Sequence, residues 1–250
     1  MSGHSKWSKV KRSKGALDVK RGTLFSRFSK EITVAARIGG ADVNGNPRLR
    51  SAVLSARAQN MPNDIVERAI KRGAGELGGQ HIEEIVYEGY APGGVAVIVE
   101  VATDNKNRAA ADIRSIFSKN HGNLASSGSV SYMFHRKGQI TVPRAGLEED
   151  RLLEIILEAG AEEMTAEEEH YAITTTPDHL YIVAEALRSA GVATESQKLT
   201  YIPETTVPIH DEHIAAQVIH LCEAMDGHDD VQNVYSNFDV PEEVLAKIPA

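Results

Sequence analysis

The segment of residues 139–202 constrains the fold most, because strand-like and helix-like patterns follow one another there in a fixed order. Two helical stretches, each ended by a glycine (Gly160 and Gly191), separate four extended stretches. The order is β-α-β-β-α-β, which is that of a ferredoxin-like domain. The expected strands are 139–142, 163–165, 171–175 and 195–202, and the expected helices are 148–159 and 177–190.

The two flanks of this segment predict a second unit of the same kind. Residues 95–135 and residues 206–237 each have the pattern of a strand, a helix and a strand. Because half-sheets that complete each other leave fewer unpaired edges, we expect them to join into another β-α-β-β-α-β unit. The first unit would then be an insertion in the second. The expected elements of the flanks are strands at 84–90, 95–103, 129–135, 206–209 and 230–237 and helices at 108–120 and after Asp211.

The N-terminal third has helical spacing instead. A first helix begins near Thr23 and ends at Gly39-Gly40, Asn46-Pro47 opens a second, and Pro62 opens a third. A glycine-rich linker follows. The predicted fold class is therefore α+β, with an N-terminal three-helix bundle and two ferredoxin-like (βαββαβ) domains, one inserted in the other. The expected domains are 1–77 with a mobile arm at 1–20, 80–136 plus 204–240, and 137–203.

Charge divides the chain in the same way. The first thirty residues hold nine Lys or Arg and one acid, in a chain of net charge −8. Residues 1–77 carry a net charge of +10, from 16 basic and 6 acidic residues, and residues 78–250 carry −18. A like-charged block predicts a polyanionic partner, although a solubilising tail would have the same composition. The candidate nucleic-acid-binding residues are His4, Lys6, Trp7, Lys9, Lys11, Arg12, Lys14, Lys20, Arg21, Arg48, Arg50, Arg57, Arg68, Lys71 and Arg72.

Two finer interpretations of these residues stay open. Trp7, the only tryptophan, is able either to stack on an unpaired base or to pin the arm to the bundle. Arg50 and Arg57 share one helix face. Arg68, Lys71 and Arg72 share another, so a helix-turn-helix with residues 65–72 as reader is compatible with the spacing. A solvated face is the ordinary alternative for such cations.

Motifs of catalysis and metal binding are missing from the sequence. It has no phosphate-binding GxxxxGK[ST] loop, no HExxH and no pair of cysteines, and Pro92-Gly93-Gly94 joins two strands instead of opening a helix. We therefore expect no enzyme, no catalytic residue, no cofactor, no metal and no small-molecule substrate. His210, His213 and His220 are expected to be solvated.

Location follows from similar reasoning. The single cysteine, Cys222, lies on an apolar helix stripe and is expected in a core; one cysteine allows no internal disulfide and fits a reducing compartment. No apolar run approaches the roughly 20 residues that cross a bilayer, and no apolar segment follows the basic N-terminus. The expected location is the cytoplasm, without a membrane partner.

Several local motifs occur together along the chain. They include GHSKW at residues 3–7, NPRLR at 46–50, NMP at 60–62, YEGY at 87–90 and PGG at 92–94. In these the chain resembles the YebC family, which includes PmpR and the mitochondrial translational activator of a cytochrome oxidase subunit. The resemblance implies a helical N-terminal domain, two α+β domains, and a cytoplasmic regulator. Some members are described as DNA-binding transcriptional regulators and others as ribosome-associated translation factors.

The sequence thus predicts a cytoplasmic nucleic-acid-binding regulator of gene expression, in the first place a DNA-binding transcriptional regulator. The alternative is a ribosome-associated, rRNA-binding translation factor or translational activator, which a basic arm suits because ribosomal surfaces are irregular. A second alternative is a protein-interaction scaffold, since ferredoxin-like units host many functions. The expected partner is nucleic acid, either DNA or RNA within the ribosome.

Overall fold

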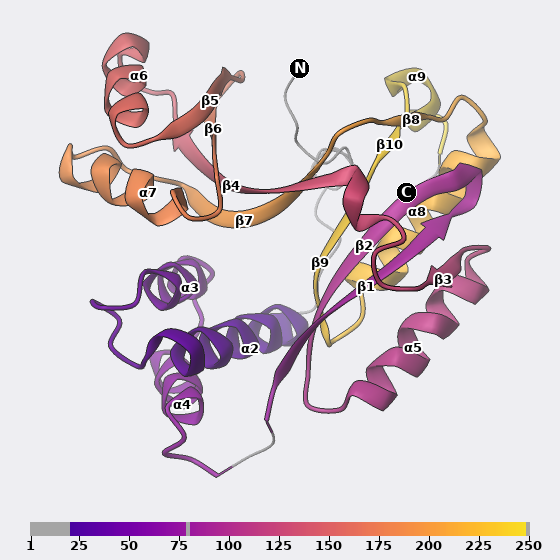
Figure 1. The fold of residues 1–250 in the computed structure, drawn as a ribbon, viewed down its shortest axis with the longest axis horizontal. Coiled ribbons are helices and arrows are strands. Elements are labelled where there is room, and N and C mark those ends of the chain that lie inside the picture. Colours follow the sequence, from indigo (N-terminus) through magenta and orange to yellow (C-terminus); the bar gives the residue numbers. More distant parts are fainter. Residues whose placement is uncertain (1–20, 79–80, 249–250) are drawn as a thin grey trace. The chain divides into compact units, whose positions relative to one another are not determined.

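A computed structural model describes residues 21–78 and 81–248 of the chain (Figure 1). The described residues divide into two compact units, Arg136–Ile202 and the remainder, and each is treated by itself. The predictions on residues 1–20 lie outside the described residues. The larger unit contains the N-terminal helices together with a four-stranded and a two-stranded sheet, so the proposed boundary at residue 77 stays a prediction.

Three helices form the N-terminal part of the larger unit, as predicted: α2 (Arg21–Gly39), α3 (Pro47–Ala58) and α4 (Asn63–Gly73). Asn46 caps α3, because its side-chain oxygen accepts from Leu49 N at 3.1 Å. Its side-chain amide also donates to Ala35 O on α2 at 2.8 Å. Ala69 is buried as expected on α4, but Val66 fills the core where Ile65 and Ile70 are only half-buried. The core members are Ile32, Ala35, Ala36, Leu49, Ala52, Val53, Ala56, Met61, Val66 and Ala69.

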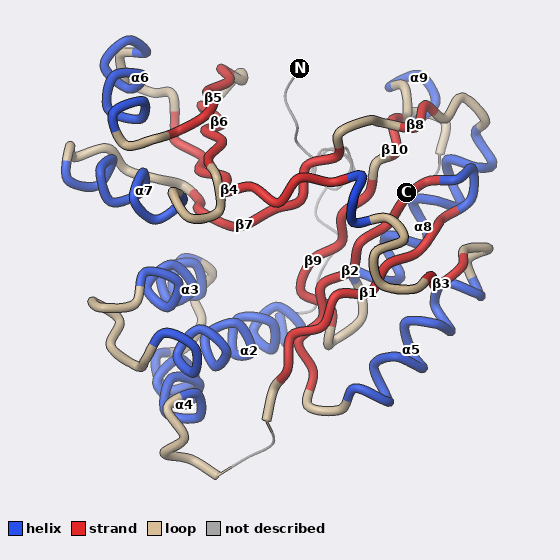
Figure 2. The backbone as a smooth tube through the Cα atoms, in the orientation of Figure 1, coloured by secondary structure: helices blue, strands red, loops and turns tan. Residues whose placement is uncertain are grey.

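An antiparallel sheet with two helices makes up the rest of the larger unit (Figure 2). Strands β1 (Glu83–Ala91) and β2 (Val95–Thr103), of nine residues each, form a hairpin across Pro92–Gly94. The edges are β3 (Asn123–Ala125) and β9 (Val231–Ser236), in the order β3-β1-β2-β9. Helices α5 (Lys106–Lys119) and α8 (Glu212–Asp226) pack on the sheet and on each other.

The chain closes with a small ribbon outside that sheet. Strand β8 (Val207–Pro208) pairs in parallel with β10 (Phe238–Asp239), and the short helix α9 (Glu242–Leu245) follows. None of the described helices is both long enough and apolar enough to span a membrane.

The inserted unit has the predicted ferredoxin-like order. Its sheet has the strand order β5-β6-β4-β7, and the core is formed by strand and helix side chains such as Ile140, Leu152, Ile173 and Leu180. The elements are β4 (Phe134–Pro143), α6 (Glu149–Glu158), β5 (Ala161–Ala166), β6 (His170–Thr175), α7 (Leu180–Ser189) and β7 (Ser196–Pro203).

The predicted α+β class is confirmed, and the two sheets share one spatial order, but a different strand completes the larger one. Strand β1 takes the place that β6 has in the inserted unit, whereas the sequence predicted residues 206–209 there. That segment contains Pro208, which has no N–H for the middle of a sheet, and only two of its residues pair at all.

The predicted strand at residues 129–135 of the larger unit is also wrong, because β3 (Asn123–Ala125) is the edge strand there and β4 belongs to the other sheet. Ser131–Met133 is a 3₁₀ turn, and β4 begins at Phe134. The backbone N–H groups of Val130 and Ser131 are hydrogen-bonded to the carboxylate of Glu88, so they are not available to a strand ladder.

Candidate nucleic-acid interface

The fifteen candidate residues fall into three groups in the structure. Eight of them lie outside the described residues, and Arg21 is the first residue of α2. The other six lie on α3 and α4, where their surroundings differ. The eight are His4, Lys6, Trp7, Lys9, Lys11, Arg12, Lys14 and Lys20.

Arg48 is used by the fold. Its guanidinium lies 2.8 Å from Glu31 on α2 and 2.7 Å from Glu84 on β1, so it ties α3 to a second helix and to the sheet. Burial alone would lower the pKa of Arg48, but the hydrogen bonds to both carboxylates outweigh it and raise the pKa. A phosphate would have to displace two carboxylates, so Arg48 is a poor candidate for nucleic-acid contact.

Arg50 is also engaged. Its guanidinium donates to the carbonyl oxygens of Val43, at 3.3 Å from Nε, and of Asn44. Arg50 therefore stabilises the loop between α2 and α3. Arg57, which was predicted to share its helix face, is exposed instead.

The remaining four cations are exposed: Arg57 near the end of α3, and Arg68, Lys71 and Arg72 on α4. Arg68 lies 3.7 Å from Asp64 one turn earlier, in a pair whose side chains are both more than 60% exposed. Among residues 21–78 and 81–248, the other three have no ion-pair partner. We call these four residues the exposed helical cations.

The order of charges along α4 bears on how it would meet nucleic acid. Its first half exposes Asp64 and Glu67, and its second half exposes the basic residues. In a helix-turn-helix, residues near the N-terminus of the reading helix approach the bases. Carboxylates there would face phosphates, so the structure disfavours α4 as a major-groove reader and favours contact through the C-terminal half.

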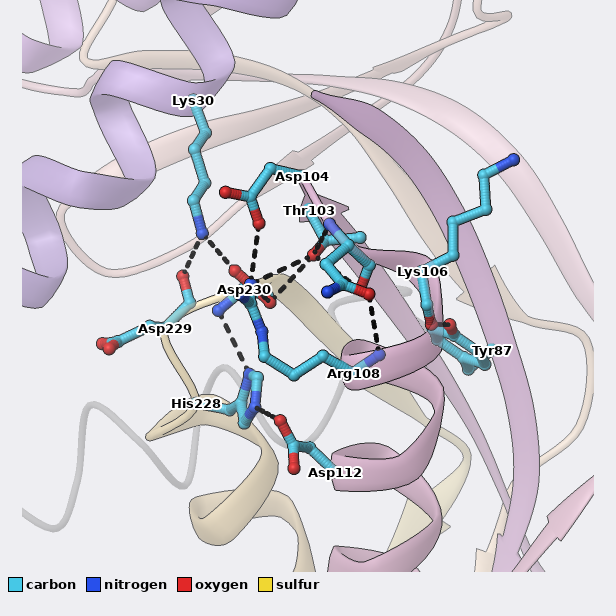
Figure 3. A network of polar contacts seen from close by, with 11 residues as sticks. Lys30, Tyr87, Thr103, Asp104, Lys106, Arg108, Asp112, His228, Asp229 and Asp230 are labelled. Atoms are coloured by element: carbon cyan, nitrogen blue, oxygen red, sulfur yellow. Dashed lines mark hydrogen bonds and ion pairs between the residues drawn. The ribbon is translucent and has the colours of Figure 1, made fainter. Parts of the chain in front are cut away.

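Two cations of the N-terminal block are bound to acids at the end of α8 and in the turn after it, and Figure 3 shows the contacts of Lys30. Arg27 lies 3.3 Å from the carboxylate of Asp226 and also donates to its carbonyl oxygen. Lys30 lies 2.5 Å from the Asp230 carboxylate and donates to the Asp229 carbonyl at 2.8 Å. The sequence analysis counted both residues in the basic block that was expected to bind phosphate. In the structure each is paired with an acid of the same unit.

Asp230 is the centre of this polar network, which the sequence analysis missed (Figure 3). Its carboxylate also accepts from Arg108 at 2.9 Å and from Thr103 at 3.0 Å. Burial would raise the pKa of Asp230, but the hydrogen bonds from Lys30 and Arg108 lower it to about 2. The three aspartates within residues 226–230 were the available signal in the sequence. The residues that contact Asp230 are remote in sequence, so the network could not be predicted from them.

A cleft of ≈ 1020 Å³ adjoins the network. Arg72, Lys30 and Arg108 line it together with Asp104, Asp112 and Asp229. Its walls carry both signs of charge, so it lacks the uniformly basic lining of a phosphate site. Arg72 is the one member of the exposed helical cations that lines this cleft.

The structure also locates the cysteine and the histidines that the sequence singled out. Cys222 is fully buried in the core of the larger unit, as predicted, and burial raises the pKa of its thiol to about 12. His213 is hydrogen-bonded to Gln217, and His220 lies 3.4 Å from Glu223. Within the described part of the chain, no three His, Cys, Asp or Glu side chains are arranged to hold a metal ion.

The class of protein is defined by an N-terminal helical module and two α+β units, one inserted in the other. The sheets of these two units have the same spatial strand order. A family profile described as "TACO1/YebC protein N-terminal domain" matches residues 5–76, and one described as "TACO1/YebC second and third domain" matches residues 82–238. The chain belongs to the TACO1/YebC family, as its motifs predicted.

Full-length relatives agree with this assignment. A protein of Desulfotalea psychrophila named "Probable transcriptional regulatory protein" is 52% identical over 99% of each chain. One of the same name in Treponema pallidum is 53% identical over 98% of this chain and all of its own. The crystal structure of a conserved hypothetical protein from Aquifex aeolicus, 50% identical, superposes with a TM-score of 0.82 over 91% of this chain and 94% of its own.

Proposed function

We propose that this protein is a cytoplasmic, non-enzymatic regulator of gene expression that binds nucleic acid through its basic N-terminal third. One observation carries the proposal. Arg57, Lys71 and Arg72 are exposed and without an ion-pair partner among the described residues, whereas Arg48, Arg27 and Lys30 are paired with acids. Unpaired cations release counterions from phosphates on binding, and paired ones do not. The names of the relatives support transcription as the regulated process, and we propose DNA as the target.

A second candidate, translation regulation through ribosomal RNA, is favoured by the charges of α4. Asp64 and Glu67 stand where a major-groove reader would approach the bases. The second half of α4 and the basic arm would contact backbone phosphates. Such contacts do not require a regular groove. Structured RNA supplies such a surface.

Binding titrations with duplex DNA and with ribosomes, each at two salt concentrations, test both candidates. The variants are a chain lacking residues 1–20, the pair Lys71→Gln/Arg72→Gln, and a matched pair Arg151→Gln/Arg188→Gln on exposed positions of α6 and α7. We expect the truncation to weaken binding most. The first pair should reduce the log–log salt slope by about 2, and the matched pair should leave it unchanged.

The outcomes separate the possibilities. Equal affinity of the truncated and full chains for both ligands would refute the role of the basic third. Tight, salt-resistant and sequence-dependent duplex binding would establish the transcriptional candidate. Duplex binding that disappears near physiological salt while ribosome binding persists would establish the translational one.

A further inference from the structure

A second segment of the chain is free of acids although it lies in the acidic two-thirds. Residues 113–147 contain no Asp or Glu, while they hold five Lys or Arg and two His. The whole region from residue 78 to 250 has 29 acids in 173 residues, so about six would be expected in a stretch of this length. The part of the segment that belongs to the larger unit, residues 113–135, holds two of these Lys or Arg and both His, so it has a net positive charge within an acidic region.

The part of this segment within the larger unit is well exposed. Arg114 and Lys119 lie at the surface of α5, and His121 follows at the end of that helix. Tyr132 is 71% exposed, which is the greatest exposure among the large hydrophobic and aromatic side chains that the structure describes. Leu54 and Ile182, at 56% and 55%, are less exposed.

The backbone that carries Tyr132 is fixed by a buried carboxylate. Glu88 on β1 is only 4% exposed, and its oxygens accept backbone N–H groups of Gly128 at 2.8 Å, Val130 at 2.7 Å and Ser131 at 2.9 Å. Burial would raise the pKa of Glu88, but these three backbone hydrogen bonds outweigh it and lower the pKa. The loop before Tyr132 is therefore anchored to the sheet by a charged group that stays ionised.

Anchors lie on the other side of Tyr132 as well. Met133 N donates to Val130 O at 2.9 Å, closing the 3₁₀ turn around Tyr132, and Glu204 N donates to Met133 O at 2.9 Å. Val130 itself is fully buried. An aromatic ring thus projects into solvent from a backbone whose conformation is set on both sides, which reduces the entropy lost when a partner contacts the ring.

We infer that Tyr132 is a stacking platform for an unpaired nucleotide base, carried by an acid-free segment whose net positive charge favours the phosphates of the same strand. Each base has a π-face, so an exposed, fixed ring accepts any of them. Arg114 and Lys119 belong to the same acid-free segment of the sequence and add positive charge to it. Glu204, which lies 3.9 Å from His135, is an acid close to this segment. The inference rests on the proposed function and adds a contact outside the basic N-terminal third.

The charge of the surroundings favours a nucleotide over an apolar protein surface as the partner. Of the other exposed apolar side chains of the α+β units, Val86 lies on β1 and is 42% exposed, whereas Leu153, Leu157 and Ile182 belong to the inserted unit. In residues 136–202 that unit has six Lys or Arg against thirteen Asp or Glu. Tyr132 is the exposed ring that stands on the acid-free segment.

The test uses a single-stranded RNA oligonucleotide that carries 2-aminopurine, a fluorescent base whose emission is quenched on stacking. Wild type, Tyr132→Ala, Tyr132→Phe and Ile182→Ala are titrated with it and with a duplex of the same length. Loss of one base stack corresponds to about 1–3 kcal/mol, so Tyr132→Ala should weaken single-strand binding about 5-fold to 150-fold and abolish the quenching. Tyr132→Phe and Ile182→Ala should behave like wild type, and duplex affinity should not change.

The result that overturns the inference is single-strand binding and quenching in Tyr132→Ala equal to those of wild type. An equal loss in Ile182→Ala would overturn it too, because the effect would then be general. Circular dichroism and thermal unfolding verify that each variant is folded. If wild-type protein binds neither oligonucleotide nor ribosomes, the proposed function itself fails. Binding lost on removal of residues 1–20 but unaffected by Tyr132→Ala refutes this platform alone.

Discussion

The ammonium group of Lys30 lies 2.5 Å from a carboxylate oxygen of Asp230, across 200 residues of sequence. The pair joins α2 to the start of β9, and the Asp230 side chain is only 6% exposed. Removing one partner of a buried ion pair is costly, because the other is left charged and unpaired. This contact therefore makes the position of α2 depend on the ionisation of an acid in the turn between α8 and β9.

Asp230→Asn should destabilise the protein in a pH-dependent way. The pKa of Asp230 is lowered to about 2, against an unfolded value of about 3.9, so its ionisation stabilises the fold above pH 4. That contribution, about 2 kcal/mol, is lost as pH falls from about 4 to 2. Urea unfolding of wild type and variant should show a difference that is largest at pH 7 and shrinks toward pH 2.

The neighbouring Asp229→Asn is the matched control, because the Asp229 side chain is exposed and its carboxylate accepts only a 3.4 Å contact from Thr23 among the described interactions. We expect its unfolding free energy to stay within about 0.5 kcal/mol of wild type. A constant difference between wild type and Asp230→Asn from pH 7 to pH 2 would contradict the assignment.

Arg48→Ala should affect stability and leave the electrostatics of nucleic-acid binding alone. The substitution breaks the pairs with Glu31 and Glu84, which we expect to cost about 1–3 kcal/mol of unfolding free energy. Lys at this position is unable to reproduce the fork of hydrogen bonds, so Arg48→Lys should recover only part. Lys71→Ala should do the reverse, with unchanged stability and a smaller salt slope. An Arg48→Ala protein of wild-type stability with weakened binding would show that Arg48 contacts phosphate after all.

Cys222 should be unreactive in the folded protein. The thiolate is the reactive species, and burial raises the pKa of the thiol to about 12 while also excluding the reagent. A chromogenic disulfide reagent at pH 8 should release signal only as fast as the protein unfolds, and one equivalent should appear at once in denaturant, since the chain has one cysteine. Rapid reaction of native protein would place this side chain at a surface.

Gly89→Ala should destabilise the sheet of the larger unit. A Cβ at Gly89 would lie 2.6 Å from the Phe117 ring and 2.6 Å from the Asn123 carbonyl oxygen, so β1, α5 and β3 would all have to move. Overpacking of this kind costs about 1–3 kcal/mol. Gly22→Ala is the control, because nothing lies within 4 Å of a Cβ there and alanine favours a helix. A drop in melting temperature for Gly22→Ala and none for Gly89→Ala would contradict this packing.

Much of the fold could be predicted from the sequence because the signals were local. Asn46-Pro47 marks the start of α3 by capping chemistry, and the alternation from residue 139 to residue 202 marks a ferredoxin-like order. The strand that completes the larger sheet was not predicted. Its choice depends on which of two distant segments, around residues 83–91 or 206–209, has enough backbone donors to fill the central place.

The candidate site was predicted less well, because a count of cations carries no information about their partners. Arg48 and Lys71 look alike in the sequence, yet one lies between two carboxylates and the other is exposed. The acid-free segment around Tyr132 was visible as composition, but its anchoring by Glu88 joins residues about 40 positions apart.

By itself the sequence determined the order of helices and strands, the family motifs and the separation of charge between the first third and the rest. These depend on neighbouring residues and on totals, which a linear chain already contains. Only the tertiary structure decided which cations are paired, which strand completes the sheet and where Asp230 and Glu88 make their contacts. Hydrogen bonds and ion pairs act over a few ångströms, and only folding brings residues as far apart as Lys30 and Asp230 within that range.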